Sequence, residues 1–107
     1  MSGLPPASHQ VHSEFSPLAE ADLIEIGDYI AQDNPRRAES FIGELIDQVG
    51  KIARMPSAYL AREDLASGLR MCTHARYILF FRVLGDVVRV ERVLHGRRDI
   101  DPDDFSV

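Results

Sequence analysis

The chain has 107 residues and a formal net charge of −5, from 12 basic and 17 acidic side chains. This length favours a single domain, 1–107, with a modest core. The negative charge argues against direct nucleic acid binding by the chain alone, and a single cysteine, Cys72, excludes an internal disulfide. The longest apolar run, Tyr77 to Phe81, is too short to span a bilayer. No lysine or arginine precedes Arg36, so the N-terminus lacks the basic start of a secretory signal. We therefore expect a cytoplasmic protein without a membrane partner.

The charges are unevenly distributed along the chain. Residues 1–65 carry five basic and eleven acidic side chains, whereas residues 66–100 carry seven arginines and three acidic side chains. Such a division favours a local basic surface that accepts an acidic partner.

The first predicted elements are an irregular lead-in over residues 1–8 and a short strand over His9 to Phe15. Ser16-Pro17 then places a capping serine before a proline at the first helical position. Apolar residues follow at intervals of four, three and four positions, which is typical of one helix face: Ala19, Leu23, Ile26 and Ile30. We expect this helix to end near Gln32.

A second helix is predicted to begin at Asn34-Pro35, where the same start signal recurs. It carries a broad apolar stripe and ends before Met55-Pro56, because proline cannot continue a helix. The turn between the two helices is so short that they must lie antiparallel, as a helical hairpin. A loop or irregular turn over Tyr59 to Ser67 and a strand over Leu69 to Thr73 follow.

The most regular pattern is a β-hairpin, with strands over Arg76 to Leu84 and Val87 to His95. Gly85-Asp86 between them fits a two-residue turn, because glycine in the first position suits the twist of paired strands. This loop predicts five cross-strand pairs: Leu84 with Val87, Arg82 with Arg89, Phe80 with Glu91, Ile78 with Val93, and Arg76 with His95.

Side chains alternate along a strand, so the predicted pairs share one face of the sheet. The other face would hold almost only apolar residues and should meet the core: Tyr77, Leu79, Phe81, Val83, Val88, Val90, Arg92 and Leu94. We expect Arg92 to reach the edge of that face or to pair with a helix carboxylate such as Asp22 or Asp28. The other acidic residues of this helix are interpreted, with these two, as a solvated face.

The predicted fold class is α+β, in the order β-α-α-β-β-β. The antiparallel helical hairpin should cover the apolar face of a small, mainly antiparallel sheet and leave the arginine-bearing face open. Residues 100–107 form an acidic tail in which Phe105 could be a late anchor. Cys72 is expected to be a small buried hydrophobe. No cofactor motif occurs, and His9 and His12 lack the neighbouring ligands of a metal site.

Three segments, SPLAEADLIEIGDYI, SGLRMCTHARYILFFRV and VERVLHGRRDI, resemble the ParE branch of the ParE/RelE toxin superfamily. The resemblance covers roughly residues 10–100. It implies the toxin component of a type II toxin–antitoxin system, neutralised by an antitoxin that wraps an extended, partly disordered segment around it. It further implies that ParE-type members inhibit DNA gyrase, whereas RelE-type members cleave mRNA in the ribosome.

The residues favour a non-catalytic inhibitor over a nuclease. Cleavage of RNA by its 2′-hydroxyl needs a base, an acid and cations. Arg70 falls where nucleases of the family carry an arginine, and His95 falls near a position where some carry a histidine. The lysine clusters and the C-terminal tyrosine of RelE-type enzymes have no match, because the only lysine is Lys51 and no tyrosine follows Tyr77. A ribosome-dependent mRNA endonuclease using Arg70 and His95 is the runner-up, and an inactive homologue that only binds antitoxin is a third alternative. For His95 alone, the residues favour a structural role at the end of its strand, within a hydrogen-bond network, over a catalytic one.

The antitoxin is expected to bring an acidic, partly apolar segment to the arginine-bearing face. The predicted antitoxin- or target-binding residues are Arg70, Arg76, Ile78, Phe80, Arg82, Arg89, Val93 and His95.

Overall fold

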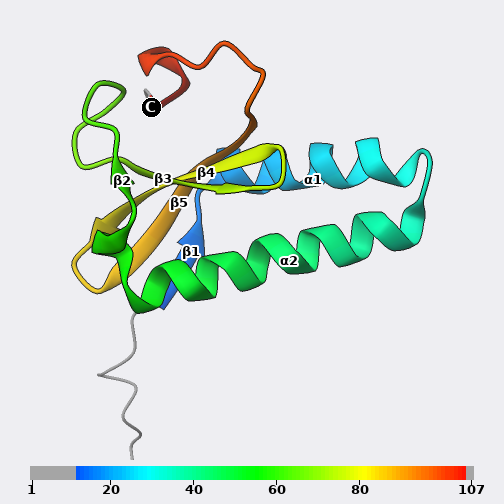
Figure 1. The fold of residues 1–107 in the computed structure, drawn as a ribbon, viewed down its shortest axis with the longest axis horizontal. Coiled ribbons are helices and arrows are strands. Elements are labelled where there is room, and N and C mark those ends of the chain that lie inside the picture. The colour runs from blue at the N-terminus through cyan, green and yellow to red at the C-terminus, as the bar shows by residue number, and fades with distance from the viewer. Residues whose placement is uncertain (1–11, 106–107) are drawn as a thin grey trace, which may run out of the picture.

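The computed structural model describes residues 12–105, so the predicted lead-in and residues 9–11 of the first strand lie outside it (Figure 1). The helices are α1 (Pro17–Ala31) and α2 (Pro35–Arg54). The strands are β1 (His12–Phe15), β2 (Leu60–Ala61), β3 (Arg70–His74), β4 (Tyr77–Leu84) and β5 (Val87–His95). Two 3-10 helices, η2 (Pro56–Ala58) and η3 (Pro102–Phe105), follow α2 and β5.

The strands form one sheet in the order β1-β5-β4-β3-β2. Only the β1–β5 pair is parallel, and the other three pairs are antiparallel. The predicted fold class is confirmed. The difference is β2, a two-residue edge strand within the predicted loop, which pairs with Arg70 and Met71.

Both helices begin at the predicted caps. The Ser16 hydroxyl accepts a hydrogen bond from the Ala19 backbone N–H at 3.0 Å, and the Asn34 side chain accepts one from the Arg37 N–H at 3.0 Å. Each bond satisfies a backbone donor that the first helical turn leaves open. The Ser16 hydroxyl also donates to the Glu91 carbonyl at 2.8 Å, which anchors the start of α1 to β5.

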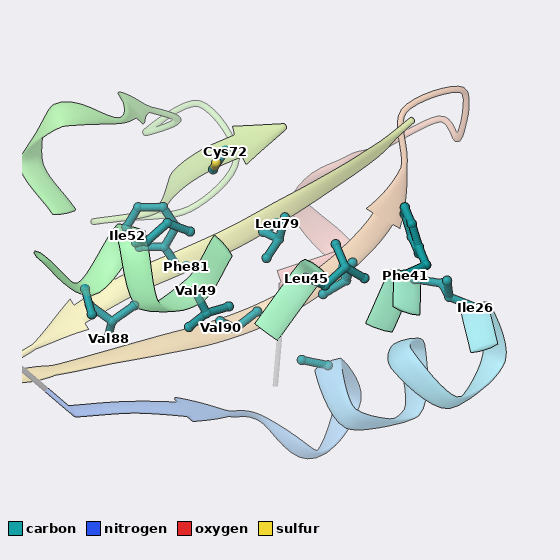
Figure 2. Packing of buried hydrophobic residues seen from close by; sticks show 13 residues of the cluster. Ile26, Phe41, Leu45, Val49, Ile52, Cys72, Leu79, Phe81, Val88 and Val90 are labelled. Atoms are coloured by element: carbon teal, nitrogen blue, oxygen red, sulfur yellow. The ribbon is translucent and has the colours of Figure 1, made fainter. Parts of the chain in front are cut away.

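The larger core lies between the helical hairpin and the sheet (Figure 2). Leu45, Val49 and Ile52 of α2 face the strands, where Leu79, Phe81, Val88 and Val90 are fully buried. The predicted core-facing side is therefore confirmed for these four strand residues. Cys72 is buried in the same cluster, as expected, and burial raises the pKa of its thiol.

A β-bulge in the hairpin contradicts part of the predicted register. Leu84 pairs with Val87 and Arg82 with Arg89 as expected, but the register shifts between Phe80 and Phe81. Beyond the shift the observed pairs are Phe80–Arg92, Leu79–Val93, Ile78–Leu94 and Tyr77–His95. The predicted pairs of Phe80, Ile78 and Arg76 were wrong because a bulge inserts one residue and reverses the alternation of faces.

The bulge exchanges the faces of the residues that follow it in β5. Val93, predicted on the open face, is buried in the core beneath the helices. Arg92, predicted on the core side, instead forms a bidentate ion pair with Asp22 of α1, with N···O distances of 2.8 and 2.9 Å. The predicted pairing with Asp22 is confirmed. The interpretation of Asp22 as a solvated residue was wrong, because its side chain also accepts from the Val93 backbone N–H at 2.9 Å.

The second sheet face is not open along its whole length. Phe80 is fully buried in a smaller cluster with Leu65, Leu69, Leu94 and Phe105. The Phe105 ring meets the Phe80 ring edge-on, with centroids 4.9 Å apart. Figure 1 shows the loop after β2 and the C-terminal η3 on the side of the sheet opposite α2. The acidic tail thus contains the anchor expected at Phe105, and it covers part of the face predicted to be free.

Candidate functional site

A groove lies where the helical hairpin reaches past the end of the sheet. It has a volume of about 730 Å³. Ile26, Tyr29 and Ile30 of α1 and Phe41 of α2 contribute to its lining from the helical side. The sheet contributes the β3–β4 turn and the end of β5, including Ala75, Arg76, Tyr77, Leu94 and His95. The lining is therefore largely apolar and aromatic, and its charged side chains are Arg37, Arg76 and Arg98 together with Asp22 and Glu25.

His95 lies at the end of β5, against Tyr77. Their ring centroids are 5.1 Å apart in an edge-on arrangement, and His95 Nδ1 accepts a hydrogen bond from the Arg97 backbone N–H at 3.0 Å. Nδ1 is therefore occupied as an acceptor. Burial raises the pKa of the Tyr77 hydroxyl, with smaller contributions from Tyr29 and Glu25 across the groove.

The groove's cations differ in their partners. Arg37 pairs with Glu44 at 2.6 Å and lies over the Phe41 ring, and Arg98 pairs with Asp104. Within residues 12–105, Arg76 and Arg97 form no ion pair. Arg76 lines the groove, and both arginines line a smaller depression beside His95. These two side chains have their charges available for an anionic partner.

The turn that carries Arg76 is strained. Ala75 has a φ of 54°, in the left-handed region that alanine rarely adopts. Ala75 and Arg76 form the two-residue turn between β3 and β4, and a positive φ at the first position of such a turn is usual, so the turn itself accounts for this conformation.

Arg70 lies far from this groove. Its guanidinium donates to the Tyr59 carbonyl at 2.6 Å, and on β3 it pairs with Phe81 of β4. His95 pairs with Tyr77, four residues further along β4, a separation of about 13 Å along the strand. General acid–base catalysis needs groups within hydrogen-bond reach of the same substrate atoms. Arg70 and His95 therefore do not form one catalytic site in this structure.

A match to a protein family settles which group of proteins the chain falls in. The family model described as "ParE toxin of type II toxin-antitoxin system, parDE" matches residues 14–100. The chain belongs to the ParE toxin family. It is a ParE-type toxin of a type II toxin–antitoxin system, as the resemblance of its three segments implied.

Individual relatives agree with this assignment. Toxin ParE1 of Mycobacterium tuberculosis, from two strains, is 34% identical over 89 residues, which cover 81% of this chain and 91% of ParE1. Among solved structures, the chromosomal ParDE TA system from P. aeruginosa matches with a TM-score of 0.69 and 23% identity, over 81% of this chain and 97% of that one. The RelBE2 toxin–antitoxin complex from M. tuberculosis matches with a TM-score of 0.60 and 22% identity, over 80% and 98%. These two structures share the fold of this ParE-type toxin.

The eight site residues predicted for this ParE-type toxin do not lie on one surface of the structure. Arg76, Val93 and His95 line the groove, although Val93 is only 2% exposed, and Ile78 lines the depression beside it. Phe80 and Val93 are buried in different clusters, so they cannot form an accessible surface together. The expectation of one continuous binding face was wrong, because the bulge turns Val93 inward and Phe105 covers Phe80.

Arg82 and Arg89 lie opposite each other, toward the other end of β4 and β5. Arg89 pairs with Glu14 at 2.6 Å, which raises the pKa of the arginine. Glu91 at the bulge lies 3.8 Å from Arg82 and 3.7 Å from Arg89. The two acidic side chains offset the repulsion expected between the arginines, although the buried Arg82 Nε has no hydrogen-bond partner within residues 12–105.

The helical side of the groove escaped prediction from the sequence. Tyr29 and Arg37 belong to helix surfaces, and Phe41 belongs to the apolar stripe of α2. Their positions in helices gave no sign that they meet Arg76 and His95.

Among residues 12–105, no three histidine, cysteine or acidic side chains could hold a metal ion. None of the helices described is long and apolar enough to cross a membrane.

Proposed function

We propose that this ParE-type toxin inhibits DNA gyrase by binding it, without a catalytic step, and that a cognate antitoxin neutralises it. The observation that carries the proposal is the match to the ParE toxin family over residues 14–100. Gyrase inhibition is what the family resemblance implies for members of this branch. The target would be met in the cytoplasm.

The arrangement of the nuclease candidates supports inhibition by binding. Arg70 is hydrogen-bonded to the backbone after α2 and pairs with Phe81 within β4, whereas His95 of β5 pairs with Tyr77 at the start of β4. Lys51 belongs to the last turn of α2, on an element that contributes only Arg37 and Phe41 to the groove. A mechanism through His95 would therefore have to draw its cations from the neighbouring arginines alone.

The groove is the surface that we propose for the antitoxin. Its apolar base, including Ile30 and Phe41, would hold apolar side chains of the antitoxin segment. Arg76 and Arg97 would attract the segment's carboxylates, since neither is already paired within the described residues. An acidic segment with apolar anchors matches both features, and it could fold as it binds.

The test of the target uses purified toxin freed of antitoxin. We expect it to block supercoiling by gyrase or to trap cleaved DNA, and added antitoxin should restore supercoiling. Unimpaired supercoiling at excess toxin would contradict the proposal. Cleavage of A-site codons in programmed ribosomes, lost in His95→Ala, would establish the nuclease instead. Growth that is unaffected by soluble, folded toxin would identify an inactive homologue that only binds antitoxin.

The antitoxin surface can be tested by charge reversal. Arg76→Glu should weaken antitoxin binding about tenfold or more, because it replaces an attraction by a repulsion at the groove. Lys51→Glu, an exposed reversal near the far end of α2, is the matched control and should change the dissociation constant by less than about threefold. Equal effects of the two variants, measured by titration calorimetry, would place the antitoxin elsewhere.

A further inference from the structure

The outer face of α1 carries an unusual combination of exposed side chains. Ile24 and Tyr29 are 66% and 68% exposed, and Leu18 is 48% exposed. Glu20, Glu25 and Asp28 are exposed beside them. No lysine or arginine occurs anywhere before Arg36. This helix therefore presents apolar and acidic side chains to solvent without any basic residue among them.

These residues form a continuous surface on the helix. Glu20, Ile24 and Asp28 follow at intervals of four residues, which places them in one row along α1. Ala21, Glu25 and Tyr29 form a neighbouring row, and together the rows cover about half of the helix circumference. We call these six residues, with Leu18, the outer face of α1.

The fold itself does not use this surface. The buried residues of α1 are Ala19, Asp22 and Ile26, which face the sheet and α2. Within residues 12–105, none of Glu20, Glu25 and Asp28 forms an ion pair. Large apolar side chains of a surface helix normally face the core, and an exposed apolar patch with a polar rim marks an interaction site.

We propose that the outer face of α1 binds the protein target of the toxin through a basic, partly apolar segment of that target. The acidic side chains complement basic residues, whereas Arg76 at the groove complements the acidic antitoxin. This inference rests on the proposed function as an inhibitor that acts by binding. It adds the surface of the toxin and the chemistry of the segment that it meets.

The position of this face also explains how the antitoxin would neutralise the toxin. Glu25 and Tyr29 belong to the outer face of α1 and also line the groove. An antitoxin segment seated in the groove would therefore cover one border of the target surface. Neutralisation then follows from steric overlap and needs no change in the toxin's conformation.

The test is a double variant that avoids the groove. Ile24→Gln with Asp28→Lys removes the most exposed aliphatic side chain of α1 and reverses one charge, and neither residue lines the groove. Glutamine keeps the helix propensity, and lysine in the last turns suits the helix dipole, so we expect the variant to fold. The toxin concentration for half-inhibition of gyrase should rise about tenfold or more. Antitoxin affinity should change by less than about threefold.

A matched control makes the same change on α2. Ile46→Gln with Glu39→Lys alters a half-exposed isoleucine and an exposed acidic residue outside the groove, and it should inhibit like the wild type. The inference would be overturned if the α1 variant inhibited gyrase as well as the wild type does, or if the control lost as much inhibition as the α1 variant. In either case, inhibition by the wild type would still support the proposed function.

Growth arrest after expression without antitoxin gives a second reading that does not depend on gyrase. If the wild type arrests growth but leaves gyrase active, the gyrase proposal fails, and the inference stands only if the α1 variant alone loses the arrest. A wild type that neither inhibits gyrase nor arrests growth would overturn both.

Discussion

At the residue scale, the ion pair between Asp22 and Arg92 joins three parts of the chain. Asp22 accepts two hydrogen bonds from the Arg92 guanidinium and one from the Val93 backbone N–H. It therefore provides a hydrogen-bond acceptor for the backbone of β5 beyond the end of β1. Arg92 also donates to the Asp104 carbonyl at 3.2 Å. Asp22 holds the pKa of Arg92 above its usual value. The pair thus connects α1, β5 and η3.

Asp22→Asn should destabilise the fold by about 3 kcal/mol, because the nearly buried Arg92 loses its bidentate carboxylate and keeps only that of Asp104, 4.0 Å away. The amide nitrogen would also face donors instead of accepting from them. Asp28→Asn, an exposed change on the same helix, should alter stability by less than about 0.5 kcal/mol. Chemical denaturation of both variants measures the difference. Similar midpoints would mean that the Asp22–Arg92 pair contributes little to folding.

At the element scale, Glu44 connects α2 to β3 of the sheet. Its carboxylate pairs with Arg37 on the same helix at 2.6 Å and with His74 of β3 at 2.9 Å. The hydrogen bond from Arg37, and then that from His74, lowers the pKa of Glu44 from its ordinary 4.5 to about 2. The folded state therefore binds the proton of this group less readily than the unfolded chain does.

The stability from Glu44 should consequently depend on pH. It is fully present above pH 4.5 and is lost as the pH falls from 4.5 towards about 2, where the carboxylate of the folded protein is protonated. Because the side chain is 41% exposed, water screens the interaction and the effect should be modest. Wild type and Glu44→Gln should thus differ in melting temperature at neutral pH and converge near pH 2. Glu39→Gln is the control, and a difference that is constant across this range would contradict the assignment.

The η3 segment is a second element whose contribution can be isolated. Phe105 covers Phe80 from the side of the sheet opposite the helices, so its removal exposes a fully buried ring. Phe105→Ala should cost about 3 kcal/mol of stability and speed hydrogen exchange in the middle of β4. Asp103→Ala, exposed in the same short helix, should leave both nearly unchanged. If Phe105→Ala behaves like this control, the tail does not pack on the sheet in solution.

At the scale of the whole molecule, local signals predicted the helices and the larger core, and tertiary contacts decided the rest. Ser16-Pro17 and Asn34-Pro35 act within a single turn, which is why both helix starts were predicted correctly. The bulge at Glu91 leaves no local mark, because it is stabilised by contacts with Ser16, Arg82 and Arg89. One extra residue there was enough to misplace Arg92 and Val93.

Only the sheet side of the groove could be predicted from the sequence, because the helical side depends on tertiary packing. Arg76 and His95 stand at strand ends, where the chain exposes polar side chains, and they were expected to belong to a binding surface. Tyr29 and Arg37 line the same groove only because the helical hairpin extends past the end of the sheet. No spacing in the sequence indicates how far the helices extend beyond the strands. A functional surface shared between distant elements is fixed by packing, so it is the part that sequence patterns least reveal.

The distribution of charge leads to a prediction about association with the antitoxin. A net charge of −5 by itself predicts repulsion of an acidic partner, so added salt would speed binding. The fold instead brings Arg76 and Arg97, which form no ion pair within residues 12–105, to the groove and the adjoining depression, while the outer face of α1 carries acidic residues. Local fields of this kind steer a charged partner to one part of a surface despite an unfavourable net charge.

The association rate constant should therefore fall with salt, by about tenfold between roughly 0.05 and 0.5 M, while the dissociation rate changes much less. Stopped-flow mixing of toxin with antitoxin measures both rates. In Arg76→Glu with Arg97→Glu, the steering charges are reversed, and the salt dependence should flatten or change sign. Faster association of the wild type at high salt would mean that net charge governs the encounter, and the groove would then have to be abandoned as the antitoxin's point of entry.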